Sequence, residues 1–153
     1  MRGKFIRVMA TGLGTGLSPF APGTVGTILG IPLYLLFALF SPTLYLLSTI
    51  AFCFFAVYIS GEAEKLYGEK DPSKIVIDEI AGFLVVMLFV PVSPYTVAAG
   101  FILFRFFDIL KPYPIRLMEQ RLPGGYGVVA DDVMAGIYAA IVLQLVIYLS
   151  GMV

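Results

Sequence analysis

Apolar residues run through this chain in long blocks that short polar stretches separate. Proline or glycine stands at the ends of most blocks, for example at Ser41-Pro42, at Pro91–Pro94 and at Lys111–Pro114. Proline interrupts helices, so these positions predict breaks between helical segments. The pattern predicts an all-α chain whose five apolar helices cover residues 24–40, 43–61, 75–90, 95–110 and 132–149.

The connecting stretches differ in character. Residues 8–23 are rich in glycine, proline and threonine, and we expect a structured loop there, with a re-entrant path as one option. Residues 62–74 alternate in charge and predict a helix end followed by a loop. Residues 115–122 predict a short amphipathic helix at a membrane interface, which Pro123–Gly125 ends.

Composition changes this picture from a helical protein to a membrane protein. Hydrophobic residues make up 59% of the 153 residues and charged residues 13%, against about 45–50% and about 25% in soluble domains. A single small domain has a large surface relative to its volume, so it cannot bury all of these extra hydrophobic residues in its core. We therefore expect one membrane-embedded domain over residues 1–153, a polytopic helix bundle with about five spans. Several blocks fall short of the usual ~20 residues, so neighbouring helices or flanking loops must shield them.

The basic residues predict an orientation. If the N-terminus lies in the cytoplasm, residues 1–23, 62–77 and 105–131 face it, while 41–42, 91–94 and the C-terminus face outward. All ten Lys and Arg residues then fall on the cytoplasmic side or in adjoining helix ends, as the positive-inside tendency requires. The acids fall on the same side, so one face of the bundle holds every ionisable side chain.

Composition also excludes several kinds of chemistry. The chain has no histidine, which removes histidine-based acid–base catalysis and histidine-ligated zinc. Its single cysteine, Cys53, lies in an apolar run and is expected to be a small buried hydrophobe. The formal net charge is zero, so nothing favours a nucleic-acid partner.

Two acidic pairs lie in or beside the apolar blocks. Asp78 and Glu79 begin the third block, and Asp131 and Asp132 lie at the start of the fifth. Favourable contact with the helix dipole explains one acid at such a place, and capping explains one aspartate, but each explains two adjacent acids less well. Ionisable residues within spans are usually functional. Gly82 and Gly136 each follow an acid by four positions, which allows close approach of another helix or a head group.

A third group joins charges of both signs. Arg105, Asp108 and Lys111 are spaced three apart at the end of the fourth block. An internal ion pair that makes Asp108 tolerable in the bilayer explains this group as well as a functional role does. Near the N-terminus, Ser18 and Thr24 stand among glycines whose backbone amides can hold an anion. A flexible entry loop is an equal interpretation there, because no Walker-type motif is present.

With the five helices crossing the membrane in this order, the acids lie at one depth in the bilayer, where several ionised carboxylates would repel one another. A divalent cation removes that conflict, and an all-oxygen ligand set favours Mg²⁺ over zinc. We expect Glu79, Asp108, Asp131 and Asp132 as metal ligands. Nearby bases suit a phosphate, and the expected substrate-binding residues are Ser18, Thr24, Lys111 and Arg116. Such a site fits a phosphorylated, lipid-anchored substrate reached from the cytoplasmic leaflet.

Four motifs in order, SPFAPGTVG, IVIDEIAG, FRFFDILKPYPI and GGYGVVADDVMAG, span nearly the whole chain. Together they resemble the phosphatidylglycerophosphatase A family of bacteria. The resemblance implies an all-α protein of the bacterial inner membrane, with its active site facing the cytoplasm. It also implies Mg²⁺-dependent hydrolysis of phosphatidylglycerophosphate, a glycerophospholipid, to phosphatidylglycerol and phosphate.

For such a reaction we expect Asp78 or Asp131 to act as base and Arg105 to stabilise phosphoryl charge. A covalent aspartyl-phosphate is the other open route. Two non-phosphatase hypotheses remain: a cation or proton carrier that uses the acids as a relay, and a scaffold in which acids and bases pair structurally. The outer half of each span lacks ionisable groups, which disfavours a carrier. The sequence does not predict an oligomeric state.

Overall fold

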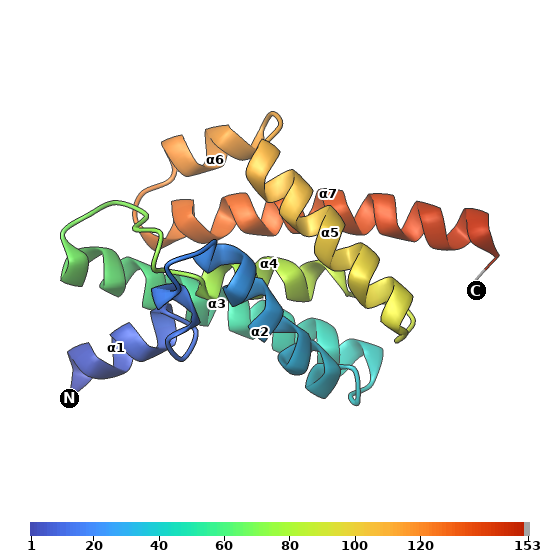
Figure 1. Cartoon of the computed structure of the whole chain (residues 1–153), viewed down its shortest axis with the longest axis horizontal. Coiled ribbons are helices and arrows are strands. Elements are labelled where there is room, and N and C mark those ends of the chain that lie inside the picture. Colours follow the sequence, from blue (N-terminus) through green and yellow to red (C-terminus); the bar gives the residue numbers. More distant parts are fainter. Residues whose placement is uncertain (152–153) are drawn as a thin grey trace.

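The computed structural model describes residues 1–151, and every regular element within that range is helical (Figure 1). The prediction of an all-α chain is confirmed. The elements, in order, are α1 Arg2–Ala10, the short 3-10 turn η1 Thr15–Leu17, α2 Pro22–Phe37, α3 Pro42–Tyr67, α4 Ile77–Val86, α5 Pro94–Leu110, α6 Ile115–Arg121 and α7 Gly125–Ser150.

The short helix α4 lies at the centre of the bundle, among α2, α3, α5 and α7 (Figure 1). Its residues are buried on nearly every side, which is why its sequence is apolar all round after the two acids. Two glycines make the crossing with α7 possible. A Cβ on Gly136 would lie 2.5 Å from the Gly82 carbonyl oxygen, so the backbones are in direct contact. This close approach confirms the expectation drawn from the two glycines.

Two helices, α3 and α7, are long and apolar enough to cross a membrane, and α2 is a shorter apolar helix. The five predicted spans are therefore not all established by length. Both long helices leave large apolar side chains exposed along one face, a pattern that suits contact with lipid. On α7 these exposed residues are Ile137, Ile141, Leu145, Val146 and Leu149.

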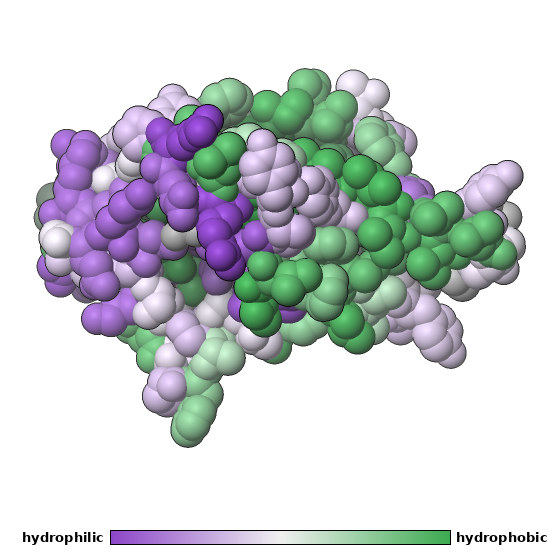
Figure 2. All heavy atoms as spheres, turned by 90° about the horizontal axis from the view of Figure 1, so that it is seen from above, coloured by the Kyte–Doolittle hydropathy of each residue, from purple (hydrophilic) through white to green (hydrophobic). Residues whose placement is uncertain are grey.

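The surface is divided along the long axis of the molecule. Figure 2 shows hydrophilic residues gathered at the end where α1 and the last turns of α3 lie, and hydrophobic residues toward the C-terminal half of α7. The sequence between residues 80 and 104, and from 133 onward, contains no charged residue. Both observations agree with one polar end and one apolar end.

Several predicted boundaries are wrong. The expected loop 8–23 contains the end of α1, the turn η1 and the first residues of α2, whereas the helix end predicted within residues 62–74 is confirmed, because α3 ends at Tyr67. The fifth helix begins at Gly125, seven residues before the predicted start. Gly125 is helical because it packs against α3, where an added Cβ would collide with the Val57 carbonyl oxygen. Only Gly124 of this glycine run supplies the turn, with a φ of 55°.

A candidate active site at the polar end of the bundle

A polar cavity of about 270 Å³ opens where the N-terminal ends of α2 and α4 meet the C-terminal end of α5 and the first turns of α7. Side chains from four separate parts of the sequence converge on it. Its lining residues are Ala21, Pro22, Gly23, Asp71, Ser73, Ile75, Asp78, Glu79, Arg105, Asp108, Lys111, Asp131 and Asp132.

Three of the acids form a tight cluster. Asp78, Glu79 and Asp132 each offer a carboxylate oxygen, and these oxygens all lie within 4.8 Å of one another. Asp78 and Asp132 are 5% and 3% exposed, so water screens them little. The buried Oδ1 of Asp78 and Oε2 of Glu79 have no hydrogen-bond partner among the residues that the structure describes. Crowded, unpaired carboxylate oxygens fit a hard divalent cation such as Mg²⁺.

The other two acids face bases. Asp108 forms an ion pair with Arg105 one turn earlier on α5, and the Arg105 Nη1 atom also lies 3.7 Å from Glu79 Oε1. Lys111 Nζ lies 2.6 Å from Asp131 Oδ2. The site is thus divided into an acid cluster and two acid–base pairs. The Nε atom of Arg105 is buried without a hydrogen-bond partner, so the guanidinium has donor capacity left.

The N-terminus of α2 forms another wall. Its Ncap residue, Ala21, has a φ of 42°, and no side chain caps the helix. Helix geometry leaves the first N–H groups without an intrahelical acceptor, which here concerns Gly23 and Thr24 because Pro22 has no N–H. Gly23 lies so close that an added Cβ would collide with Glu79 Oε1 and stand 3.1 Å from the Arg105 Nη atoms.

Some predicted substrate-binding residues lie elsewhere. Ser18, the Thr24 side chain and Arg116 do not line this cavity. The Ser18 hydroxyl donates to the Phe20 carbonyl within the loop, and Arg116 is exposed on α6. Their predicted contact with the substrate phosphate is untested by this geometry.

Sequence reasoning did not name six of the lining residues as site residues: Ala21, Pro22, Gly23, Asp71, Ser73 and Ile75. Asp71 and Ser73 lie in the loop after α3, and Gly23 lies in the first turn of α2. The signal for Gly23 was its place in the motif SPFAPGTVG. Nothing local distinguished Asp71 and Ser73 from other polar loop residues, since only the folded chain brings that loop over the acids.

Comparison with known proteins places this arrangement in a family. The family model described as phosphatidylglycerophosphatase A matches residues 8–147, a range that includes every residue lining the cavity. This chain belongs to the phosphatidylglycerophosphatase A family. The family makes the chain a phosphatase.

Curated relatives from three bacteria are similar along most of their length. The phosphatidylglycerophosphatase A of Haemophilus influenzae is 41% identical, over 94% of this chain and 89% of the relative. That of Escherichia coli is 36% identical, over 91% and 81%. A protein of Bacteroides thetaiotaomicron, provisionally named phosphatidylinositol-3-phosphatase, is 39% identical, over 98% and 99%. No solved structure matches the chain.

These findings agree with the apolar surface. Bacterial phosphatidylglycerophosphatase relatives, together with two helices able to cross a bilayer, indicate a membrane protein that acts on a phospholipid.

Proposed function

We propose that the chain hydrolyses phosphatidylglycerophosphate to phosphatidylglycerol and phosphate with the help of Mg²⁺. The observation that carries this proposal is the convergence of six acids and two bases on one cavity at the polar end of the bundle. A phosphomonoester needs both a neutralising cation and positive side chains, and this cavity offers ligands for the first and supplies the second.

Glu79 and Asp132 are the proposed ligands of Mg²⁺, with Asp78 beside them in the same cluster. When bound, the ion would polarise the phosphoryl oxygens and counter their charge. Asp108 and Asp131 were also predicted as ligands. Their pairing with Arg105 and Lys111 supports an additional role, in which each acid fixes the direction of its basic partner.

The substrate phosphate is proposed to lie between Arg105, Lys111 and the N-terminus of α2. A guanidinium and an ammonium stabilise phosphoryl oxygens as negative charge develops on them. The Gly23 and Thr24 N–H groups point from the positive end of a helix dipole, a common anion-binding arrangement. Gly23 lines the cavity and Thr24 follows it in the same helical turn, so we propose that Thr24 contacts the substrate through its backbone N–H and not through its side chain.

For the reaction, water attacks phosphorus, and the bond between phosphorus and the glycerol oxygen breaks. Asp78 is proposed to accept the water proton at Oδ1, an atom without a hydrogen-bond partner in the described part of the chain. The departing glycerol oxygen takes up a proton, returned by Asp78 or supplied by solvent water, and leaves as the alcohol. Asp131, the other predicted base, lies in the same cavity, and an aspartyl-phosphate route is distinguished by trapping of labelled phosphate on the protein.

We further propose a multi-pass arrangement in the bacterial inner membrane, with the polar end in the cytoplasm. The gathering of bases at this end supports it. The short helix α4 would reach only part-way through the bilayer, enclosed by its neighbours.

The test is phosphate release from phosphatidylglycerophosphate by the purified protein in detergent micelles. Chelation should abolish release, and added Mg²⁺ should restore it. Release that survives thorough chelation would contradict the metal requirement, and an inactive, folded protein with Mg²⁺ present would contradict the function.

The backbone role of Thr24 has its own test. Thr24→Pro removes one N–H at a position where proline fits a first helical turn, while Thr24→Val removes only the hydroxyl. We expect Thr24→Pro to weaken inhibition by inorganic phosphate about tenfold or more, and Thr24→Val to leave it unchanged. Equal inhibition of both variants and the wild type by phosphate would show that the Thr24 backbone N–H does not contact the phosphate.

A second substrate is worth measuring because one relative carries a different name. The Bacteroides protein, 39% identical, is provisionally named for phosphatidylinositol 3-phosphate. Both lipids present a phosphomonoester on an anionic headgroup, so the same cavity could accept either. The ratio of kcat/KM for the two lipids decides between them, and we expect phosphatidylglycerophosphate to be preferred.

A further inference from the structure

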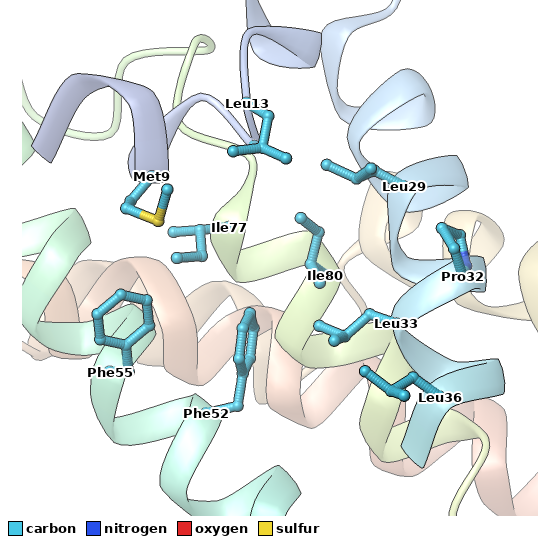
Figure 3. Close-up of a pocket in the computed structure, with 11 residues that line it drawn as sticks. Met9, Leu13, Leu29, Pro32, Leu33, Leu36, Phe52, Phe55, Ile77 and Ile80 are labelled. Carbon is cyan, nitrogen blue, oxygen red and sulfur yellow. The ribbon is translucent and has the colours of Figure 1, made fainter. Parts of the chain in front are cut away.

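A second cavity, of about 380 Å³, lies among α1, the turn that follows it, α2, α3 and α4 (Figure 3). Its volume falls within the ~300–1,000 Å³ typical of small-molecule sites. Figure 3 shows that side chains from these separate elements point into one space, and none of the labelled side chains ends in a polar group. The lining residues are Met9, Gly12, Leu13, Leu29, Pro32, Leu33, Leu36, Phe52, Phe55, Ile77 and Ile80.

This apolar cavity and the active-site cavity share one turn of α4. Ile77 and Ile80 line the first, while Asp78 and Glu79, between them in the sequence, line the second. A single helical turn therefore presents acids to one cavity and apolar side chains to the other. A molecule with a phosphate at one end and a hydrocarbon at the other matches this pair of environments.

The apolar cavity is reached from surfaces that suit lipid. Its rim residues Leu13 and Leu36 are 67% and 51% exposed, and the neighbouring Leu17 and Phe20 are exposed as well. Water is a poor occupant, because a cavity without polar partners stays dry. In a bilayer, the hydrocarbon available beside such a rim is an acyl chain.

Charge at the rim agrees with an anionic lipid. The helix α1, which contributes Met9 to the cavity, carries Arg2, Lys4 and Arg7 and no acid; Arg2 is paired with Glu62 of α3, while Lys4 and Arg7 are exposed. Phosphatidylglycerophosphate has an internal phosphodiester between its terminal phosphate and its acyl chains. With the terminal phosphate in the polar cavity, that second negative charge would lie toward a basic surface.

We propose that this cavity binds one acyl chain of the substrate lipid. The proposal rests on the proposed phosphatase function and adds a chain-binding subsite to it. The subsite makes the enzyme select long-chain lipids over water-soluble phosphomonoesters with the same headgroup.

Leu29→Trp fills the cavity from α2, at a residue outside the active site. Its matched control is Ile28→Trp, which puts the same side chain on the neighbouring, exposed position. Each variant is assayed with long-chain phosphatidylglycerophosphate and with a short-chain, water-soluble analogue. We expect Leu29→Trp to raise KM for the long-chain lipid about tenfold, the effect of excluding roughly two methylenes, with no change for the analogue. Met9→Trp, from α1, repeats the measurement if Leu29→Trp does not fold.

A separate readout needs no turnover. Native mass spectrometry counts the molecules of long-chain phosphatidylglycerol bound to the protein. The cavity-filling variants Leu29→Trp and Met9→Trp should retain fewer of them than the control Ile28→Trp does. Equal losses with both substrates, or no loss with either, would overturn the subsite. Failure of the proposed function looks different, because the wild type would then release no phosphate from either substrate. Even if the wild type is inactive, the subsite would be overturned if the cavity-filling variants retained as much phosphatidylglycerol as the wild type does.

Discussion

At the scale of single residues, the site depends on carboxylates buried beside one another. Asp78, Glu79 and Asp132 form the cluster, while Asp108 and Asp131 each face a base. Leaving a buried charge without its partner is unfavourable. Replacing one acid therefore has two effects: the role of that acid is lost, and the position or charge of its neighbours changes.

The acid–base pairs give the first prediction. Asp108→Asn and Asp131→Asn should each lower phosphate release about 100-fold or more, because Arg105 or Lys111 loses its orienting partner near the phosphate. Initial rates on phosphatidylglycerophosphate measure this. Glu69→Gln, a neutral replacement of an exposed acid outside the cavity, is the control and should keep full activity. Full activity in both Asn variants would refute these site assignments.

Gly23 gives the second residue-level prediction. An added Cβ collides with Glu79 and approaches Arg105, so Gly23→Ala should displace both side chains. Small displacements of catalytic groups reduce rates by about 100-fold. Gly3→Ala, whose Cβ would have 3.8 Å to its nearest neighbour, is the control. If Gly23→Ala retains wild-type kcat/KM, the α2 N-terminus is not in close contact with the working site.

The sequence predicted the acids and bases but not their division into groups. Adjacent pairs such as Asp78-Glu79 stand out in apolar surroundings, so the sequence marks them as candidate site residues. Which acid faces Arg105 and which faces the cluster depends on how α4, α5 and α7 pack. Asp71 and Ser73 were missed because the path of the loop after α3 is set by distant contacts.

At the scale of elements, α4 is a buried helix that ends inside the bundle. Carbonyls in its last turn and in the segment just after it accept hydrogen bonds from side chains of neighbouring helices. The Tyr45 hydroxyl of α3 donates to the Leu84 carbonyl in the last turn of α4 at 3.0 Å, and Gln144 of α7 donates to the Leu88 and Phe89 carbonyls in the segment that follows α4. These bonds let a short helix end where water is scarce.

We therefore expect Gln144→Leu to destabilise the protein by about 0.6–2 kcal/mol, the range for hydrogen bonds between membrane helices. A lower apparent Tm in detergent, with normal activity per folded molecule at low temperature, is the expected result. Leu145→Ala, at an exposed position on the same helix, is the control. An unchanged Tm for Gln144→Leu would show that these carbonyls are satisfied in another way.

Element boundaries were predicted well where proline marks them and poorly where glycine does. Pro42 and Pro94 begin α3 and α5 as expected, because proline suits a first helical turn. The glycines near residue 125 were interpreted as a turn, but Gly125 packs against α3 within a helix. A glycine in a sequence does not reveal whether it serves a turn or a close contact.

At the scale of the whole molecule, polarity along one axis organises the protein. All-α architecture followed from the apolar blocks, and the polar end followed from the distribution of charge. The number of membrane spans could not be predicted from the sequence. The length of a helix as short as α4 does not show whether it lies in the membrane, because that depends on the helices packed around it.

The orientation is tested by single cysteines introduced into a Cys53→Ala background. Lys70→Cys lies in the polar loop after α3, and Val92→Cys lies in the loop between α4 and α5. In sealed inner-membrane vesicles, an impermeant thiol reagent should label these two positions from opposite sides, with Lys70→Cys facing the cytoplasm. Labelling of both from one side would contradict the multi-pass arrangement.

The central claim is that acids distant in the sequence hold one cation next to a phosphate site. The most direct measurement is a crystal structure with Mn²⁺ and a non-hydrolysable phosphate analogue, in which anomalous scattering locates the metal. We predict a peak among the Asp78, Glu79 and Asp132 carboxylates, with the phosphate beside Arg105 and Lys111. A metal bound elsewhere, or a phosphate analogue bound without any metal in this cluster, would contradict the account.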